Sequence, residues 1–241
     1  MRETRQALCI ALDGSDRRWI LDTARAVAPY AGWLKLGLEA FVAHGPRLVE
    51  EVAGVGAQVF LDLKLHDIPA TVERAAANCA ACGAAMLTVH AGGGRRMLEA
   101  AAAGARAGAG DATTVVAVTV LTSLDRSALE ELGIGREPLD LVLRWAALAR
   151  EAGLGGVVAS AREAAAVRRS CGDDFVIVTP GIRPASAVED DQRRTLGPAA
   201  ALAAGADLLV VGRPVTRSPD PAAAAREILR EMSSRSALDP T

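Results

Sequence analysis

The chain is poor in aromatic residues, which make up 3% of its 241 positions, and its formal net charge is only −2. Surfaces that bind nucleic acids are usually basic and carry aromatic side chains on which bases stack, so this composition argues against a nucleic-acid partner. The sequence has no apolar run of the roughly 18 residues that a membrane span requires, and its start lacks the apolar stretch of a signal peptide. We therefore expect a cytoplasmic protein that binds neither nucleic acids nor membranes.

Cysteine is also scarce, with four residues in the chain. Cys79 and Cys82 have the spacing of a redox or zinc motif, but they lie in an alanine-rich stretch of helical character. The sequence holds no second pair that could complete a tetrahedral zinc site. Because free cysteines are generally buried and inert, we expect reduced, packed side chains and neither a metal site nor a disulfide.

Short apolar runs alternate with Ala-, Leu- and Arg-rich helical stretches from end to end. Eight such runs predict strands, at 8–13, 33–39, 58–65, 86–91, 113–121, 156–160, 175–180 and 207–212. Eight strand–helix units in a chain of this length are typical of a TIM (β/α)8 barrel. The alternative is a doubly wound sheet, but the Gly-x-Gly-x-x-Gly motif expected after its first strand is missing.

The sequence indicates one catalytic domain over residues 1–232, followed by a loose tail at 233–241, because no linker or low-complexity segment divides the chain. The segments at 122–137 and 182–197 are long and polar, and they follow the fifth and seventh predicted strands. In a barrel both would lie on the face that carries the active site. We expect them to be binding loops or lids.

The segment 62–67, Asp-Leu-Lys-Leu-His-Asp, is the most informative part of the sequence. Side chains alternate between the faces of a strand, so Asp62 and Lys64 should point the same way. An isolated pair of this kind would indicate a structural ion pair. With Lys35 and Asp67, however, the charges alternate in sign and would keep both lysines protonated. A protonated lysine favours proton donation to a carbanion over Schiff-base chemistry, which fits a decarboxylation.

A second group of polar residues follows the last two predicted strands. Gly181 and Arg183 follow the seventh strand, Gly212 and Arg213 follow the eighth, and Gln192 lies in the loop between them. Phosphate sites in such barrels commonly lie at these strand ends. Glycines allow backbone N–H groups to approach an anion, and guanidinium groups match the geometry of phosphate oxygens. The sequence therefore predicts a phosphate subsite here.

These stretches resemble the orotidine 5′-phosphate decarboxylase family, and the resemblance covers nearly the whole chain. The matching segments are 11–13 (ALD), 35–37 (KLG), 62–69 (DLKLHDIP), 89–91 (VHA), 121–123 (LTS), 179–183 (TPGIR), 191–192 (DQ) and 211–213 (VGR). The resemblance implies a decarboxylase of pyrimidine biosynthesis that converts orotidine 5′-phosphate to UMP and CO2 without a metal or an organic cofactor.

The resemblance also implies roles for the charged residues. Lys64 would protonate C6 of the pyrimidine as CO2 departs, and Asp62 would lie against the substrate carboxylate. Lys35 and Asp67 would complete the charge network.

Further substrate contacts and a partner follow from the same resemblance. Asp67, Ile68 and Thr71 would reach into the site of a neighbouring subunit, so that a homodimer is the working unit. The remaining expected contacts are Asp13 and Lys35 with the ribose, Thr122 and Ser123 with the pyrimidine, and Arg183, Gln192, Gly212 and Arg213 with the phosphate.

Two other functions compete with this one. Related barrels, 3-keto-gulonate-phosphate decarboxylase and hexulose-phosphate synthase, share the Asp-x-Lys-x-x-Asp signature but carry a magnesium-binding glutamate at the end of the second strand. Lys35 places an ammonium group there, which argues against the metal. A phosphate-binding barrel without catalysis would be expected to lack Asp62 or Lys64. We expect His66 and His90 to be packed or hydrogen-bonded rather than metal ligands.

Overall fold

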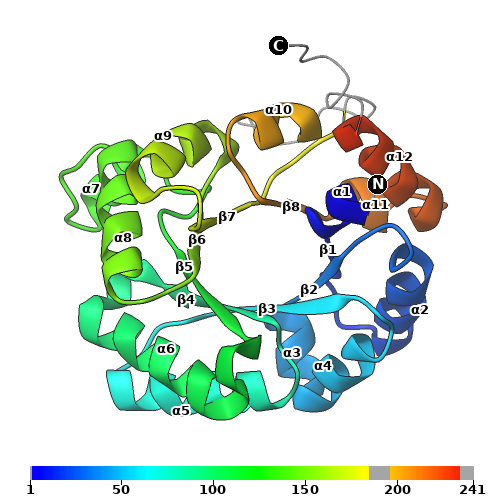
Figure 1. The fold of residues 1–241 in the computed structure, drawn as a ribbon, viewed down its shortest axis with the longest axis horizontal. Helices are drawn as coiled ribbons and strands as arrows, with labels where there is room; N and C mark the ends of the chain where they lie inside the picture. The colour runs from blue at the N-terminus through cyan, green and yellow to red at the C-terminus, as the bar shows by residue number, and fades with distance from the viewer. Residues whose placement is uncertain (1, 185–195, 234–241) are drawn as a thin grey trace.

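Eight parallel strands form a closed barrel in the computed structural model, and helices surround it (Figure 1). The structure describes residues 2–184 and 196–233. The strands are β1 (Leu8–Ala11), β2 (Trp33–Gly37), β3 (Gln58–Leu65), β4 (Met86–His90), β5 (Thr114–Val118), β6 (Gly156–Val158), β7 (Val176–Thr179) and β8 (Leu208–Val211). Each strand pairs with the next one in sequence, and β8 pairs with β1. The predicted TIM (β/α)8 barrel is confirmed.

The helices lie on the outside of the barrel and follow the strands in order (Figure 1). They are α1 (Arg2–Gln6), α2 (Arg17–Val27), α3 (Leu38–His44), α4 (Pro46–Ala53), α5 (Pro69–Ala81), α6 (Arg95–Ala109), α7 (Arg126–Glu131), α8 (Pro138–Glu151), α9 (Ala161–Cys171), α10 (Pro198–Ala203), α11 (Arg213–Thr216) and α12 (Pro221–Ser233), with 3₁₀ turns η1 (Ala91–Gly93) and η2 (Gly110–Ala112). Among the described residues, no helix is long and apolar enough to cross a membrane.

Local sequence signals explain where several helices begin. The carboxylates of Asp16 and Asp125 accept the backbone N–H of the third residue of α2 and α7, respectively. Ser160 and Glu163 form a reciprocal capping box at the start of α9. A proline opens each of α4, α5, α8 and α10, where its missing N–H costs no hydrogen bond.

The apolar core has two parts, one inside the barrel and one between the barrel and its helices. Alternate strand residues fill the interior: Cys9, Ala11, Phe60, Met86, Val116, Val178, Leu208 and Val210. The intervening residues pack outward against the helices in two larger clusters. All four cysteines are free; three are buried and Cys82 is partly buried, as expected from the sequence.

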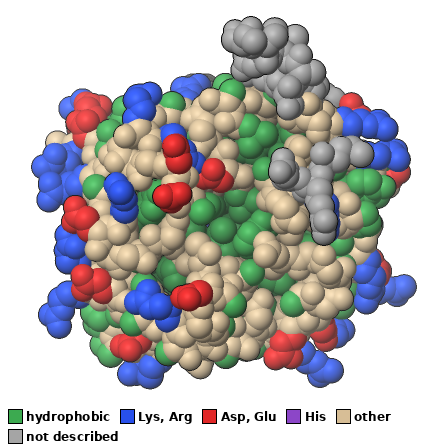
Figure 2. All heavy atoms as spheres, in the orientation of Figure 1, with side chains coloured by type: hydrophobic (Ala, Val, Ile, Leu, Met, Phe, Trp, Pro, Cys, Tyr) green, Lys and Arg blue, Asp and Glu red, His purple; other side chains and the backbone are tan. Residues whose placement is uncertain are grey.

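The surface has no single-sign character on the face shown in Figure 2. Acidic and basic side chains are interspersed around its edge, and apolar side chains gather at its centre. This distribution agrees with the small net charge.

The structure changes three details of the predicted organisation. Most of the predicted strands are longer than the observed ones; β1, for example, ends at Ala11, so Asp13 lies in the loop beyond it. The segment 122–137 is not a simple loop, because Asp125 caps the short helix α7 within it. Ser233, predicted to start the tail, ends α12, and the rest of the tail lies outside the described residues.

Arg168, in the last turn of α9, forms hydrogen bonds with both of the loops that precede β7 and β8. Its guanidinium donates hydrogen bonds to the backbone carbonyls of Gly172, Asp173 and Phe175 at 2.7–3.0 Å and to that of Gly205 at 3.0 Å. It also pairs with the Asp207 carboxylate at 2.5 Å. The Arg168 side chain is only 17% exposed, and its hydrogen bonds to Phe175 and Gly205 are partly buried.

We predict that Arg168→Ala lowers the free energy of unfolding by about 1.5–3 kcal/mol, because it leaves the partly buried carbonyls of Phe175 and Gly205 without this donor and breaks the ion pair with Asp207. Arg17→Ala is the matched control: it breaks a more exposed ion pair with Glu51, which water and salt screen, and should lower the free energy of unfolding much less. Urea unfolding of the two variants measures both values. Equal losses in the two variants would contradict the role assigned to Arg168.

Candidate active site

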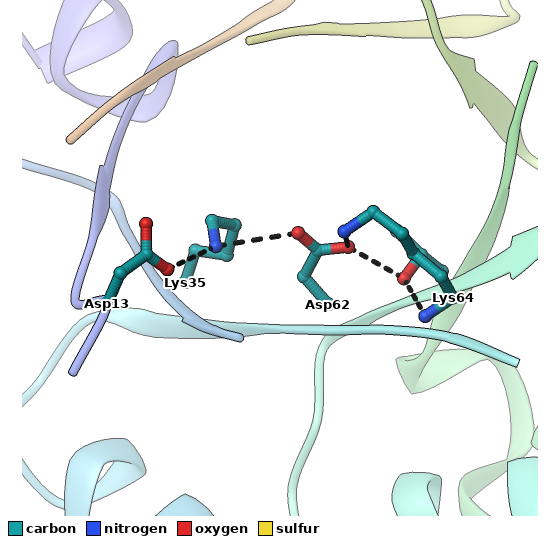
Figure 3. Close-up of polar contacts among 5 residues, drawn as sticks. Asp13, Lys35, Asp62 and Lys64 are labelled. Atoms are coloured by element: carbon teal, nitrogen blue, oxygen red, sulfur yellow. Dashed lines mark hydrogen bonds and ion pairs between the residues drawn. The ribbon is translucent and has the colours of Figure 1, made fainter. Parts of the chain in front are cut away.

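Four charged side chains lie in a row across one end of the barrel, where β1, β2 and β3 end (Figure 3). The Lys35 Nζ is 2.8 Å from Asp13 Oδ1 and 3.4 Å from Asp62 Oδ2. The Lys64 Nζ is 2.8 Å from Asp62 Oδ1. The order is therefore Asp13, Lys35, Asp62, Lys64, with alternating sign. We call these four residues the charged array.

The charged array lies at one end of the interior cluster of side chains that fills the barrel. Lys35 lies two residues after Trp33, and Asp62 lies two residues after Phe60; both preceding residues belong to the interior cluster. Because side chains alternate along a strand, the charged groups face the barrel axis at the carboxyl ends of the strands. This is the face where barrel enzymes hold their active sites.

The two central members of the array are buried and ionised. The Lys35 and Asp62 side chains are 10% and 13% exposed, whereas those of Lys64 and Asp13 are 37% and 62% exposed. Burial lowers the pKa of Lys35, but the charges of Asp62 and Asp13 outweigh it, so the net pKa is raised. Burial likewise raises the pKa of Asp62, and the ammonium groups of Lys35 and Lys64 with their hydrogen bonds bring it below its ordinary value.

Lys35 and Lys64 are the only lysines in the sequence, and every other cationic side chain of its Lys+Arg total is arginine. A guanidinium does not release its proton in proteins, whereas an ammonium can. The chain therefore places both of its lysines in the charged array. This signal was available in the sequence and strengthens the interpretation of the array as chemical.

β3 is irregular where it carries the array. Leu61 pairs with Leu87 of β4, and the next paired residue, Leu65, lies opposite Val89, so the register shifts between them. Lys64 has φ = 52°, the only positive φ of a non-glycine residue among those described. This conformation costs roughly 1–2 kcal/mol. The expected side-by-side placement of Asp62 and Lys64 is confirmed, but a strained bulge produces it rather than simple strand alternation.

Thr88 of β4 supports this irregular segment, and the sequence analysis did not identify it. Its hydroxyl accepts the backbone N–H of Lys64 at 2.8 Å and donates to Asp62 Oδ1 at 2.9 Å. The signal in the sequence was a polar residue two positions after Met86, which belongs to the interior cluster. By the same alternation that places Lys35 and Asp62, Thr88 had to face the barrel axis.

Asp67 does not join the array within one chain. Its carboxylate accepts the backbone N–H of Ile68 at 2.6 Å, and Ile68 is 67% exposed. Thr71 lies close by, in the first turn of α5. Within a single chain, Asp13 rather than Asp67 is the fourth member of the array, and the expected contribution of Asp67 to a neighbouring subunit's site stays a prediction. The predicted role of Asp67 depends on a second copy.

The predicted ribose and phosphate contacts meet where β1 and β8 end. Asp13 and Arg213 line one cavity of about 680 Å³ together with Ser15, Trp19, Thr216 and others. Gly212 lies beside it, because a Cβ on this residue would be 3.6 Å from Ala11 Cβ and 3.9 Å from Asp13 Oδ2.

The other predicted contacts lie on neighbouring loops. Gly181 lies two residues after the end of β7 with φ = 75°, a conformation that favours glycine, and Arg183 comes two residues later. Thr122 and Ser123 are exposed in the loop after β5. Gln192 lies outside the described residues.

His66 and His90 pack against each other with ring centroids 5.4 Å apart. Burial, followed by the neighbouring His66 and Lys64 charges, lowers the pKa of His90, with Asp62 opposing. A packed rather than exposed His90 agrees with the sequence analysis.

Comparison with known proteins identifies the family of the chain. Residues 6–228 match the sequence model of the orotidine 5′-phosphate decarboxylase / HUMPS family. The chain belongs to this family. It is 54% identical over 230 residues to the orotidine 5′-phosphate decarboxylase of Moorella thermoacetica, covering 93% of this chain and 91% of the relative.

Two further members of the orotidine 5′-phosphate decarboxylase / HUMPS family support the assignment. The orotidine 5′-phosphate decarboxylase of Anaeromyxobacter sp. (strain K) is 53% identical over 223 residues, covering 92% of this chain and 96% of the relative. The crystal structure of the Lactobacillus acidophilus orotidine 5′-phosphate decarboxylase superposes with a TM-score of 0.84 at 34% identity, covering 95% of this chain and all of that one. The fold and the family therefore agree.

We predict that Lys35 titrates above the ordinary lysine value of about 10.4. NMR spectra of protein labelled with ¹³C at lysine Cε should show two lysine signals. The Lys64→Arg variant lacks one of them, which assigns both signals. Because the folded pKa is the higher one, this interaction stabilises the fold below the unfolded pKa and is lost as the pH rises through the folded value. The control is the same titration in urea. A folded midpoint at or below the urea midpoint would contradict the buried array.

Proposed function

We propose that the chain decarboxylates orotidine 5′-phosphate to UMP without a metal or an organic cofactor, and that the Lys64 ammonium protonates C6. The carboxy-lyase activity is supported by the relatives that are 53–54% identical over more than nine tenths of this chain. The residue roles rest on one observation: the charged array places an ionised carboxylate between two ammonium groups at the carboxyl ends of the strands.

The array supplies both halves of the reaction. A substrate carboxylate held beside the Asp62 carboxylate is repelled by it, and this repulsion ends when neutral CO2 leaves. When the bond between C6 and the carboxylate carbon breaks, its electron pair stays on C6. Lys64 then gives one proton from Nζ to C6 and becomes a neutral amine. With 37% of its side chain exposed, Lys64 can regain a proton from water.

Lys35 keeps the array fixed and supports a metal-free reaction. Its ammonium lies between Asp13 and Asp62, so their negative charges are already balanced by a protein group. Lys35 holds the carboxylates of Asp13 and Asp62 in place before substrate binds, so these groups need little reorganisation during the reaction. Such preorganised electrostatic stabilisation is usually the largest contribution to enzymatic rate enhancement.

Binding groups around the array hold the rest of the substrate. Asp13 and Lys35 contact the ribose, and Thr122 and Ser123 contact the pyrimidine. Arg183, Gln192, Gly212 and Arg213 bind the phosphate. The shared cavity of Asp13 and Arg213 supports a ribose 5′-phosphate that extends from the array toward β8. Binding energy from the remote phosphate can then help to organise the reacting groups.

The working unit in this proposal is a cytoplasmic homodimer in which Asp67, Ile68 and Thr71 complete the partner's site. Exposed apolar side chains support such an interface: Ile68 is 67% exposed, and Leu38 and Val42 on α3 are 58% and 76% exposed. Leu38 and Val42 lie on α3, which contacts β3, and Ile68 follows the end of β3 by three residues. Large exposed apolar side chains near one another commonly mark a protein–protein interface.

We predict that the purified protein consumes orotidine 5′-phosphate at the same rate with and without a metal chelator. The loss of ultraviolet absorbance of the substrate measures turnover, and detection of UMP identifies the product. An absence of turnover would contradict the activity. Turnover that stops with chelator and returns with magnesium would place the chain with the metal-dependent barrels instead.

We predict that Lys64→Ala and Asp67→Ala each lose turnover by at least about 100-fold, because one lacks the proton donor and the other a charge of the partner's site. Activity should return when the dimers of the two variants are dissociated, mixed and allowed to re-form. In a mixed dimer one site carries both changes and the other carries neither, so about a quarter of all sites become native. An inactive mixture that contains mixed dimers would contradict the shared site, and circular dichroism controls for folding.

A further inference from the structure

Thr88 lies where β4 passes the irregular segment of β3, and we propose that its hydroxyl is a positioning group that holds Asp62 and Lys64 in the geometry required for proton transfer. The inference rests on the proposed function, which assigns the chemistry to those two residues. Thr88 itself is fully buried, with 0% of its surface exposed. It acts through the other two and not on the substrate.

The chemistry of the two partners fixes which group donates and which accepts in each hydrogen bond of Thr88. The Lys64 backbone N–H is a donor, so the hydroxyl oxygen must accept from it at 2.8 Å. The ionised Asp62 carboxylate is an acceptor, so the hydroxyl proton must point to Oδ1 at 2.9 Å. A single hydroxyl thus links the backbone of one residue to the side chain of the other.

This link holds the part of β3 that departs from regular geometry. Between the Leu61–Leu87 and Leu65–Val89 pairs, three residues of β3 lie opposite Thr88 alone. Lys64 has its backbone in the left-handed region, which the surrounding contacts must maintain. Thr88 supplies the acceptor for the N–H of that strained residue, and a valine there would leave this N–H without it.

The same hydroxyl fixes the rotation of the Asp62 carboxylate. Oδ1 accepts from both Thr88 and the Lys64 ammonium, which leaves Oδ2 toward Lys35. Without the hydroxyl, the carboxylate loses a neighbour that favours its ionised form. Loss of Thr88 should therefore change both where the ammonium is held and the pH at which Asp62 becomes protonated.

The test compares variants that separate the hydroxyl from the rest of the side chain. Thr88→Val removes the hydroxyl and keeps the shape, whereas Thr88→Ser keeps the hydroxyl and removes the methyl group. Thr113→Val is the matched control, because it also removes a buried threonine hydrogen bond, the one donated to the Ala84 carbonyl at 2.6 Å, next to the opposite end of the strands.

We expect Thr88→Val to lower kcat about 10- to 100-fold with KM changed less than about threefold, as for the loss of a hydrogen bond to a charged group. The acid limb of its kcat–pH profile should move to higher pH. Thr88→Ser should keep kcat within about threefold of the unmodified protein. Thr113→Val should lower the thermal midpoint of unfolding without changing kcat or the acid limb.

Two results would overturn the role of Thr88: an unchanged kcat and acid limb in Thr88→Val, or an equal loss in Thr88→Ser. If Thr88→Val does not fold, Thr88→Ala and Thr88→Ser make the same comparison, since both lack the methyl group and only one has the hydroxyl. Turnover by the unmodified protein is measured first. Its absence would overturn the proposed function as well, whereas turnover that Thr88→Val leaves intact would overturn only the positioning role.

Discussion

The ionised carboxylate of Asp62, held between two ammonium groups, is the interaction on which the rest of the site depends. A buried carboxylate is unfavourable unless it is paired, and here Lys35 and Lys64 pair with one oxygen each. Removing either lysine would leave a largely buried charge incompletely balanced. Removing Asp62 would leave two cations facing each other. Each charge of the array is therefore stable only while the others are present. Neighbouring strand ends bring the charged side chains together.

The barrel makes this arrangement possible, and β3 distorts to complete it. Parallel strands bring their carboxyl ends to one face, so residues distant in sequence meet without long connections. A regular strand would not suffice, because Lys64 takes a left-handed backbone conformation to place its ammonium 2.8 Å from Asp62. Backbone strain of this kind occurs at functional sites when the surrounding structure maintains it. The buried hydroxyl of Thr88 is the contact that does so here.

The fold and most residues of the array could be predicted from the sequence. Specific structural features explain why the other residues could not. All eight strands are visible as apolar runs because burial on both faces leaves no polar alternation. Lys35, Asp62 and Lys64 stand out as charges within such runs. Asp13 as an array member, the bulge at Lys64 and the contacts of Thr88 depend on inter-strand register, which one strand's sequence does not encode. Asp67, which the sequence assigns to the site of a neighbouring subunit, lies outside the array of its own chain.

If Lys64 acts by donating a proton, chemical rescue of Lys64→Ala should depend on the proton that the added cation carries. Ethylammonium brings both a positive charge and a transferable proton to the space left by the side chain, whereas tetramethylammonium brings only the charge. Ethylammonium should then restore turnover of orotidine 5′-phosphate, with a rate that saturates as its concentration rises, and tetramethylammonium should not. Equal restoration by the two cations would contradict proton donation by Lys64, because charge alone would then be enough.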